Sequence, residues 1–271
     1  MSAADDGDRS GRVVVCAVVM TVLSALTVGL RFYVRGKLLG TLKSEDWFIL
    51  LALFFSITSG ASVIEESRHG LGRHVATVTP AEMTDFWKAS YFDTLSYNFS
   101  LCCTKISILL LYLRVLTPDY IRKVIWVAFG IVVLYNAWAF AMELTICIPL
   151  AKEWDPSLPG YCHPTSVWWA LTYIHIATDF MLFVIPIPVV VTMTIPTRRK
   201  AGLLFVFTLG LFVCLISVVR TIILSRLLDS ADPMWDYVVI ANWTSAETNA
   251  AIICACMPTL RPVLAALLKQ R

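Results

Sequence analysis

Seven long apolar segments, separated by short polar linkers, constrain this chain more than any other feature of its sequence. A helix that crosses the ~30 Å hydrocarbon core of a bilayer needs about 20 residues. The segments lie at about 13–33, 47–64, 90–113, 124–146, 166–194, 201–224 and 235–260. Only 15% of the 271 residues are charged and 58% are hydrophobic, whereas soluble domains carry about 25% charged residues. The pattern therefore predicts an all-α membrane protein, a seven-transmembrane helix bundle.

The short linkers predict one transmembrane domain over residues 13–268, with a polar N-terminal segment at 1–12 and a tail at 269–271. Lys and Arg concentrate where the first, third and fifth segments end, in the linkers after them and in the tail: Arg31, Arg35, Lys37, Lys43, Arg114, Arg122, Lys123, Arg198, Arg199, Lys200, Arg261, Lys269 and Arg271. The opposite linkers hold fewer, diluted by acids such as Glu65 and Glu66. Because cytosolic loops are enriched in Lys and Arg, we expect the N-terminus outside and the C-terminus in the cytosol.

Membrane lipid is therefore the expected partner of this integral, multi-pass protein. The endoplasmic reticulum and the plasma membrane both fit the pattern. The basic residues form short clusters between apolar runs, so we expect no nucleic-acid partner.

Two of the eight cysteines, Cys147 and Cys162, lie at the edges of the linker between the fourth and fifth segments. That linker faces the oxidising side in the predicted topology, so we expect a disulfide bond between them. The other six cysteines lie within apolar segments, where a thiol behaves as a small hydrophobic group. We expect no metal site.

Ionisable residues within the apolar segments are the main candidates for function, because a charge in hydrocarbon is expensive. Counted from the outer end of its segment, Lys105 lies roughly 22 Å deep and Asp179 roughly 21 Å deep, which predicts an ion pair. His175 and Asp179 are four residues apart and share one helix face. Glu247 lies near the middle of the seventh segment. These four residues are the predicted catalytic set, although Lys105 and Asp179 could equally be a pair that only holds helices together.

Other polar and aromatic residues of the segments are candidates for ligand binding: Tyr97, Asn98, Trp168, Asn242, Trp243 and Asn249. Asp93, Glu143 and Arg220 fall within roughly 5–10 Å of the outer boundary and form a predicted outer polar cluster. We expect Arg220 either to bind one of these two carboxylates or to extend toward the membrane surface.

Several short motifs resemble a known family. They occur at 30–35 (LRFYVR), 45–48 (EDWF), 70–74 (GLGRH), 105–114 (KISILLLYLR), 243–249 (WTSAETN) and 254–262 (CACMPTLRP), together with Asp179 and the Pro-Ile-Pro step at 186–188. In order and over nearly the whole chain, they are similar to the fungal rhodopsin-like family of seven-helix membrane proteins. That family is named after a membrane protein of a satratoxin gene cluster, and it includes receptors implicated in surface sensing.

The chain departs from what the word rhodopsin implies. A retinal Schiff base needs a lysine on the last helix, and no lysine lies between Lys200 and Lys269. We therefore expect no retinal Schiff base and no other cofactor. The sequence ends at Arg271, shortly after the last segment, whereas receptor-like members of the family carry a longer tail.

Two functions remain open at this stage. The first is a membrane protein of fungal specialised-metabolite biosynthesis (mycotoxin, terpenoid or polyketide type), which acts as an intramembrane acid-base cyclase or isomerase of a lipophilic substrate. Desolvation in hydrocarbon favours a protonated carboxylic acid, which suits a general acid. The alternative is a rhodopsin-like, non-retinal receptor for a small lipophilic ligand, although the linker at 195–200 offers little surface for a G-protein.

Overall fold

The structure, a computed structural model, describes residues 9–116, 118–188, 197–227 and 232–269. The end of the fifth predicted segment and residues 270–271 lie outside these ranges. Seven long helices dominate: α1 (Ser10–Phe32), α2 (Ser44–Arg68), α3 (Pro80–Val115), α4 (Asp119–Leu144), α5 (Thr165–Val184), α7 (Thr197–Leu227) and α8 (Pro233–Lys269). Each overlaps one of the seven apolar segments. A π-helix, η1 (Tyr33–Leu38), continues α1, and two short strands, β1 (Cys147–Ile148) and β2 (Tyr161–Cys162), pair after α4.

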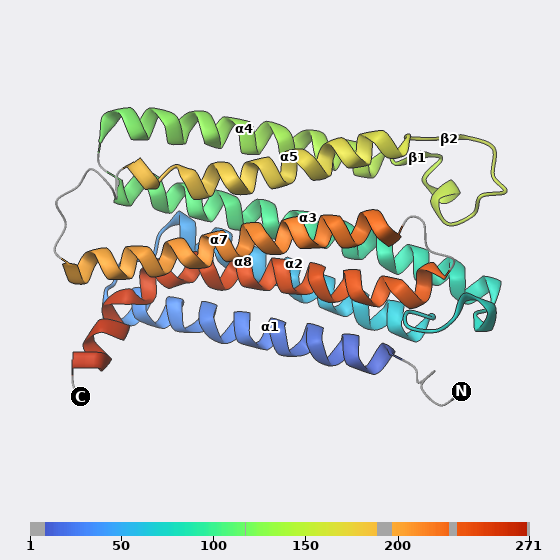
Figure 1. The fold of residues 1–271 in the computed structure, drawn as a ribbon, viewed down its shortest axis with the longest axis horizontal. Coiled ribbons are helices and arrows are strands. Elements are labelled where there is room, and N and C mark those ends of the chain that lie inside the picture. The colour runs from blue at the N-terminus through green and yellow to red at the C-terminus, as the bar shows by residue number, and fades with distance from the viewer. Residues whose placement is uncertain (1–8, 117, 189–196, 228–231, 270–271) are drawn as a thin grey trace.

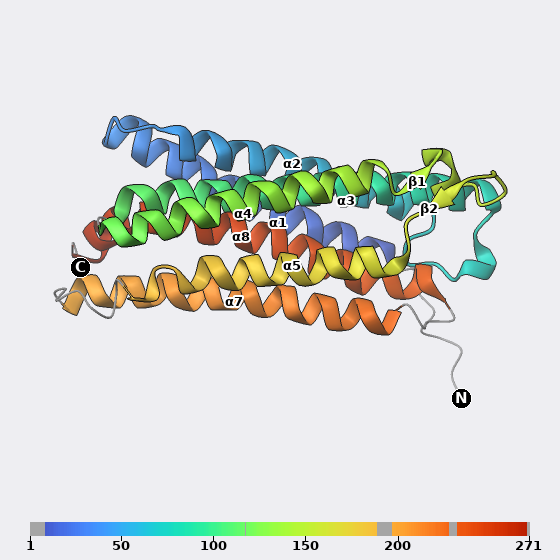
Figure 2. The same ribbon diagram turned by 90° about the horizontal axis from the view of Figure 1, so that it is seen from above.

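The long helices lie side by side, and each runs opposite in direction to the one before it (Figures 1 and 2). The strands β1 and β2 lie at the end where α1, α3, α5 and α8 begin, which we call the disulfide end. The other end, where Arg31, Arg35 and Arg114 lie, is called the arginine end. α8 contacts α1, α2, α3 and α7, so it is an interior helix. This position places Glu247 among the other helices.

The surface of the helices is apolar. Leu26, Val127 and Leu134 are 66%, 63% and 72% exposed. Six helices among the described residues are long and apolar enough to cross a membrane. α8 is not one of the six, because polar residues such as Glu247 and Asn249 lower its mean hydropathy. The prediction of a mostly helical, multi-pass integral membrane protein is confirmed.

Local signals explain where helices begin and end. Thr79 caps α3, because its side chain accepts a hydrogen bond from the backbone N–H of Glu82, whose carboxylate in turn accepts one from the N–H of Thr79. The turn after α2 contains Gly72 at φ +85°, a conformation that favours glycine. A Cβ atom there would lie 2.8 Å from the backbone nitrogen of Ser10. The turn can therefore pack closely on the start of α1.

The predicted disulfide bond between Cys147 and Cys162 is confirmed. The two cysteines are paired across β1 and β2. The bond closes the loop that joins α4 to α5, and this loop contains the 3-10 helix η3 (Leu150–Glu153). A covalent link of this kind limits the freedom of the loop at the disulfide end.

At the arginine end, residues of three sequence motifs form an ion-pair network around two buried carboxylates. Arg31 is 0% exposed; its Nε lies 2.8 Å from Oδ1 of Asp46, and its Nη1 donates to the backbone oxygen of Ala255 at 2.8 Å. Arg35 contacts Asp46 at 2.7 Å and Glu45 at 2.9 Å. Arg114 forms a further ion pair with Glu45. The network therefore joins the ends of α1, α2 and α3 to the backbone of α8.

The sequence analysis counted Arg31, Arg35 and Arg114 as charges of linkers, whereas they belong to the helices α1, η1 and α3. The helical backbone continues past the apolar segment through η1, which turns Arg35 inward to a buried position. The three arginines therefore act as partners of buried carboxylates. Solvated charges of a loop would not be paired in this way.

Replacing Asp46 tests this network. The variant Asp46→Asn leaves Arg31 buried without its carboxylate, and breaking a buried pair typically costs about 3–5 kcal/mol. We expect a clear loss of stability in the thermal unfolding of the detergent-solubilised protein. The exposed Glu65, whose partner Arg68 is also exposed, provides the control variant Glu65→Gln. Equal unfolding midpoints for the two variants would contradict the assignment.

Candidate functional site

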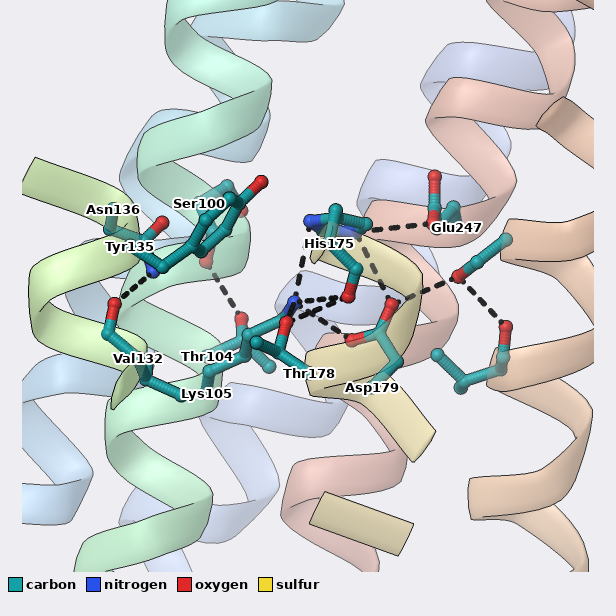
Figure 3. Close-up of polar contacts among 12 residues, drawn as sticks. Ser100, Thr104, Lys105, Val132, Tyr135, Asn136, His175, Thr178, Asp179 and Glu247 are labelled. Atoms are coloured by element: carbon teal, nitrogen blue, oxygen red, sulfur yellow. Dashed lines mark hydrogen bonds and ion pairs between the residues drawn. The ribbon is translucent and has the colours of Figure 1, made fainter. Parts of the chain in front are cut away.

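The centre of the structure contains the predicted pair of Lys105 on α3 and Asp179 on α5. Lys105 Nζ lies 3.0 Å from Oδ1 of Asp179. It also donates a hydrogen bond to the hydroxyl of Thr178 at 2.8 Å and one to the backbone oxygen of His175 at 3.3 Å (Figure 3). Because Lys105 is 3% exposed, these three acceptors take the place of water around its ammonium group.

His175 connects this pair to α8. Its Nε2 lies 3.3 Å from Oδ2 of Asp179 and 3.5 Å from Oε1 of Glu247 (Figure 3). The first contact follows from the spacing of four residues along α5. The imidazole ring therefore lies between two carboxylates from different helices. The four residues of the predicted catalytic set lie together.

Glu247 has two further partners, and neither contact was predicted. Arg220 Nε lies 2.9 Å from its Oε2, and the hydroxyl of Tyr97 donates to the same oxygen at 2.7 Å. The guanidinium carbon of Arg220 lies 4.8 Å from the centre of the Tyr97 ring, a cation–π distance. Glu247 is 0% exposed, so protein groups rather than water stabilise its charge.

The charges of this central network are balanced. Each carboxylate faces a cation: Asp179 pairs with Lys105, and Glu247 pairs with Arg220. His175 lies between the pairs and can accept a proton on one nitrogen and release one from the other. The hydroxyl of Ser217 donates a further hydrogen bond to Oδ2 of Asp179 at 3.2 Å. Such an arrangement can move a proton among Lys105, Asp179 and His175.

A cavity of about 250 Å³ opens beside this network, between α3, α5, α7 and α8. Lys105 and Asp179 belong to its wall. The rest is mostly apolar: Leu101, Ile108, Leu111, Val115, Leu116, Leu182, Phe183, Val213, Ala251 and Ala255. The α3 residues of the wall continue from Lys105 to the end of that helix, so the cavity extends toward the arginine end. Its shape suits an apolar molecule with one polar group at the ion pair.

A metal ion is a weaker interpretation of the same residues. Ligand atoms of His175, Asp179 and Glu247 all lie within 4.8 Å of one another. Lys105 and Arg220 contact the same carboxylates at 3.0 Å and 2.9 Å. Two fixed positive charges would repel a divalent cation. The arrangement therefore suits proton transfer better than metal binding.

The residues predicted to bind a ligand are dispersed. Tyr97 lies in the central network, as described above. Asn249 accepts hydrogen bonds from Ser24 at 2.6 Å and Ser56 at 3.1 Å, and so links α8 to α1 and α2. Within the described residues, Trp168, Asn242 and Trp243 form no hydrogen bond or ion pair with the central network. Depth along a helix indicates a level in the membrane but not the side to which a residue points.

The three residues of the predicted outer polar cluster have separate partners. Arg220 binds Glu247, so neither expected carboxylate is its partner. Asp93 accepts a hydrogen bond from Ser59 at 2.5 Å, and Glu143 accepts one from Asn98 at 2.8 Å. An arginine side chain is long enough to reach a carboxylate deeper in the membrane than its own Cα. Depths counted along the helices could therefore not show that Arg220 binds Glu247.

Comparison with known proteins gives the family. The model of the fungal rhodopsin domain matches residues 30–266. The SAT4 family membrane protein of Emericella nidulans is 29% identical over 73% of this chain and 51% of its own length. Receptor GIN3 of Arthrobotrys oligospora is 29% identical over 90% of this chain and 60% of its own length.

A third relative is the polyenoic acids biosynthesis gene cluster protein Ba17b of Metarhizium anisopliae, 28% identical over 93% of this chain and 73% of its own length. The chain spans only about half to three fifths of the first two relatives. No solved structure matches it. Because the family model covers most of the sequence, including the helices that carry the central network, the chain belongs to the fungal rhodopsin domain family.

Proposed function

We propose that this chain is a membrane protein of fungal specialised metabolism that binds a small lipophilic molecule in the central cavity and transfers protons on it, as a cyclase or isomerase. One observation carries the proposal: an apolar cavity of about 250 Å³ has the Lys105–Asp179 ion pair in its wall. A molecule dissolved in the bilayer could place its apolar part in the cavity and a carbonyl or hydroxyl group at the pair.

The proposal includes a seven-spanning topology with the N-terminus outside and the C-terminus cytosolic. Its support is the alternating direction of the seven helices (Figure 1) and the interior position of α8. A helix surrounded by others can carry Glu247 and Asn249 through a membrane, because these polar groups find partners inside the protein. The disulfide bond lies at the end proposed to face outside, where conditions are oxidising.

The geometry assigns roles within the proposed chemistry. Lys105 is the proton donor that lines the cavity, because its ammonium group carries a proton that can be transferred. Asp179, which also lines the cavity, accepts a proton released elsewhere on the molecule. His175, whose Nε2 lies 3.3 Å from Oδ2 of Asp179, can then take that proton from it. One proton is added and one is removed, so an isomerisation or cyclisation of this kind is redox-neutral. This assignment differs from the sequence-based expectation of a protonated carboxylic acid, since both carboxylates of the network face cations.

The relatives support both functions that the sequence left open. Ba17b is named as a protein of a polyenoic acids biosynthesis cluster, which fits a role in specialised metabolism. Receptor GIN3 aligns with 90% of this chain, which favours the second candidate, a non-retinal receptor for a small lipophilic ligand. The same cavity would serve either function, because both need a site for an apolar molecule within the membrane.

Gene deletion with metabolite profiling tests the proposal. We expect the deletion strain to accumulate an unconverted precursor, and membranes containing the wild-type protein to convert that precursor in vitro. Lys105→Gln and Asp179→Asn should reduce conversion, measured per amount of folded protein, by roughly 10²–10⁴-fold, the usual contribution of general acid–base catalysis. Asp85→Asn, at an exposed carboxylate of α3, is the matched control.

Two results would point away from catalysis. Loss of all pathway products through reduced transcription, with no conversion by wild-type membranes, would favour the receptor. Wild-type conversion by both Lys105→Gln and Asp179→Asn would confine the pair to holding helices together.

Filling the cavity provides a second test. Cys254 on α8 lines the cavity, so Cys254→Phe should occupy space that the molecule needs while leaving the ion pair intact. We expect at least a tenfold loss of conversion, since roughly 1.4 kcal/mol of lost binding corresponds to a factor of ten. The control is Cys16→Phe, the same substitution at a partly buried cysteine of α1 outside the cavity. Equal activity of both variants would show that the cavity is not the binding site.

A further inference from the structure

Two buried carboxylates near the disulfide end take no part in the central network. Glu66, in the last turn of α2, is 0% exposed, and neither of its carboxylate oxygens has a hydrogen-bond partner. Asp93 on α3 is 5% exposed, and its recorded partner is the hydroxyl of Ser59 at 2.5 Å. The sequence had placed Glu66 among the acids of an outer linker. The structure instead buries it, because α2 continues to Arg68.

Glu66 and Ser59, whose hydroxyl donates to Asp93, are seven residues apart and lie on one face of α2, which packs against α3. The hydroxyl of Tyr237 on α8 lies 3.2 Å from that of Ser90, three residues before Asp93 on α3. Glu143, a further buried carboxylate on α4, accepts a hydrogen bond from Asn98. In the described part of the chain, neither Glu66 nor Asp93 forms an ion pair with Lys, Arg or His. Arg220 of α7 is bound to Glu247.

A buried apolar cluster includes residues of the same helices. Val13 and Ala17 of α1, Val63 of α2, Phe86 of α3 and Val238 of α8 belong to one buried hydrophobic cluster at this end. Two unpaired negative charges in such a place would be very unfavourable. The central network pairs its carboxylates with Lys105 and Arg220, whereas the described residues pair no cation with Glu66 or Asp93.

We infer that the Glu66–Asp93 pair binds one small cation, a proton or Na⁺, shared between the two carboxylates. Two adjacent carboxyl groups commonly share one proton, since both cannot be ionised together. Oxygen ligands alone, from the two carboxylates and Ser59, also suit a hard metal cation. The site uses different residues from the proposed catalytic network, so it stands whether or not the cavity binds a substrate.

Cation binding by the folded chain alone predicts a linkage between cation concentration and stability. If the cation is a proton, the unfolded chain releases it, so the folded state loses stability as the pH rises. If the cation is Na⁺, stability increases with Na⁺ at constant pH and ionic strength. A tenfold change in the concentration of the free cation should shift the unfolding midpoint by about 3–6 °C.

The experiment measures thermal unfolding of the full chain in lipid nanodiscs. One series varies the pH in choline chloride, and the other replaces choline with Na⁺ at fixed pH. The wild type should show one of the two dependences, and Glu66→Gln should lose it, because the amide needs no cation. Glu65→Gln, the neighbouring exposed position, should behave like the wild type. Equal slopes for the wild type and Glu66→Gln in both series would overturn the inference.

Measurements on the wild type alone keep the inference testable if Glu66→Gln does not fold. A shared proton gives an infrared carbonyl band of a protonated carboxyl group that shifts in heavy water. A shared sodium ion gives saturable binding of radioactive Na⁺ by the nanodisc sample. Finding neither the band nor the binding would overturn the inference.

Discussion

The cost of placing charge in an apolar interior constrains how the helices of this protein pack. Lys105, Arg220 and Glu247 are buried, and the side chain of Asp179 is 11% exposed. Lys105 pairs with Asp179, and Arg220 pairs with Glu247, so the two pairs join α3 to α5 and α7 to α8. Arg31, Arg35, Glu45 and Asp46 are paired at the arginine end. Because each charge needs its partner at hydrogen-bond distance, the pairs determine which faces of the helices turn inward.

The two networks differ in what surrounds them. The pairs at the arginine end are packed between α1, α2 and α3 with the backbone oxygen of Ala255 as a further acceptor, an arrangement suited to stability. The central pairs include a histidine between two carboxylates and adjoin a cavity. A titratable group beside space for a ligand is the usual sign of chemistry or regulated binding. This contrast is why we assign function to the centre and structural support to the arginine end.

The sequence predicted the helical membrane class, the Cys147–Cys162 bond and the meeting of Lys105 with Asp179. These three predictions were correct because the length of an apolar segment, the position of a cysteine and the depth of a residue along a helix can be read from the sequence. None of them requires knowing which helices are neighbours. Arg220 with Glu247 was missed because it depends on side-chain reach and on α7 packing against α8. The Arg31–Asp46 pair was missed because the sequence does not distinguish a charged residue at the end of a helix from one in a loop. The available signal was the presence of opposite charges on the two sides of one short linker. The burial of Glu66 was missed because the predicted segment ended at residue 64, whereas α2 continues to Arg68.

A double-mutant cycle on Lys105 and Asp179 tests the central claim most directly, by measuring the stability of Lys105→Met, Asp179→Leu and the double variant in nanodiscs. Paired burial predicts that each single variant is destabilised by about 3–5 kcal/mol, because it leaves one charge alone. The double variant should regain most of that loss, since no unpaired charge remains. Losses that simply add in the double variant would contradict the account, because the two charges would then not depend on each other.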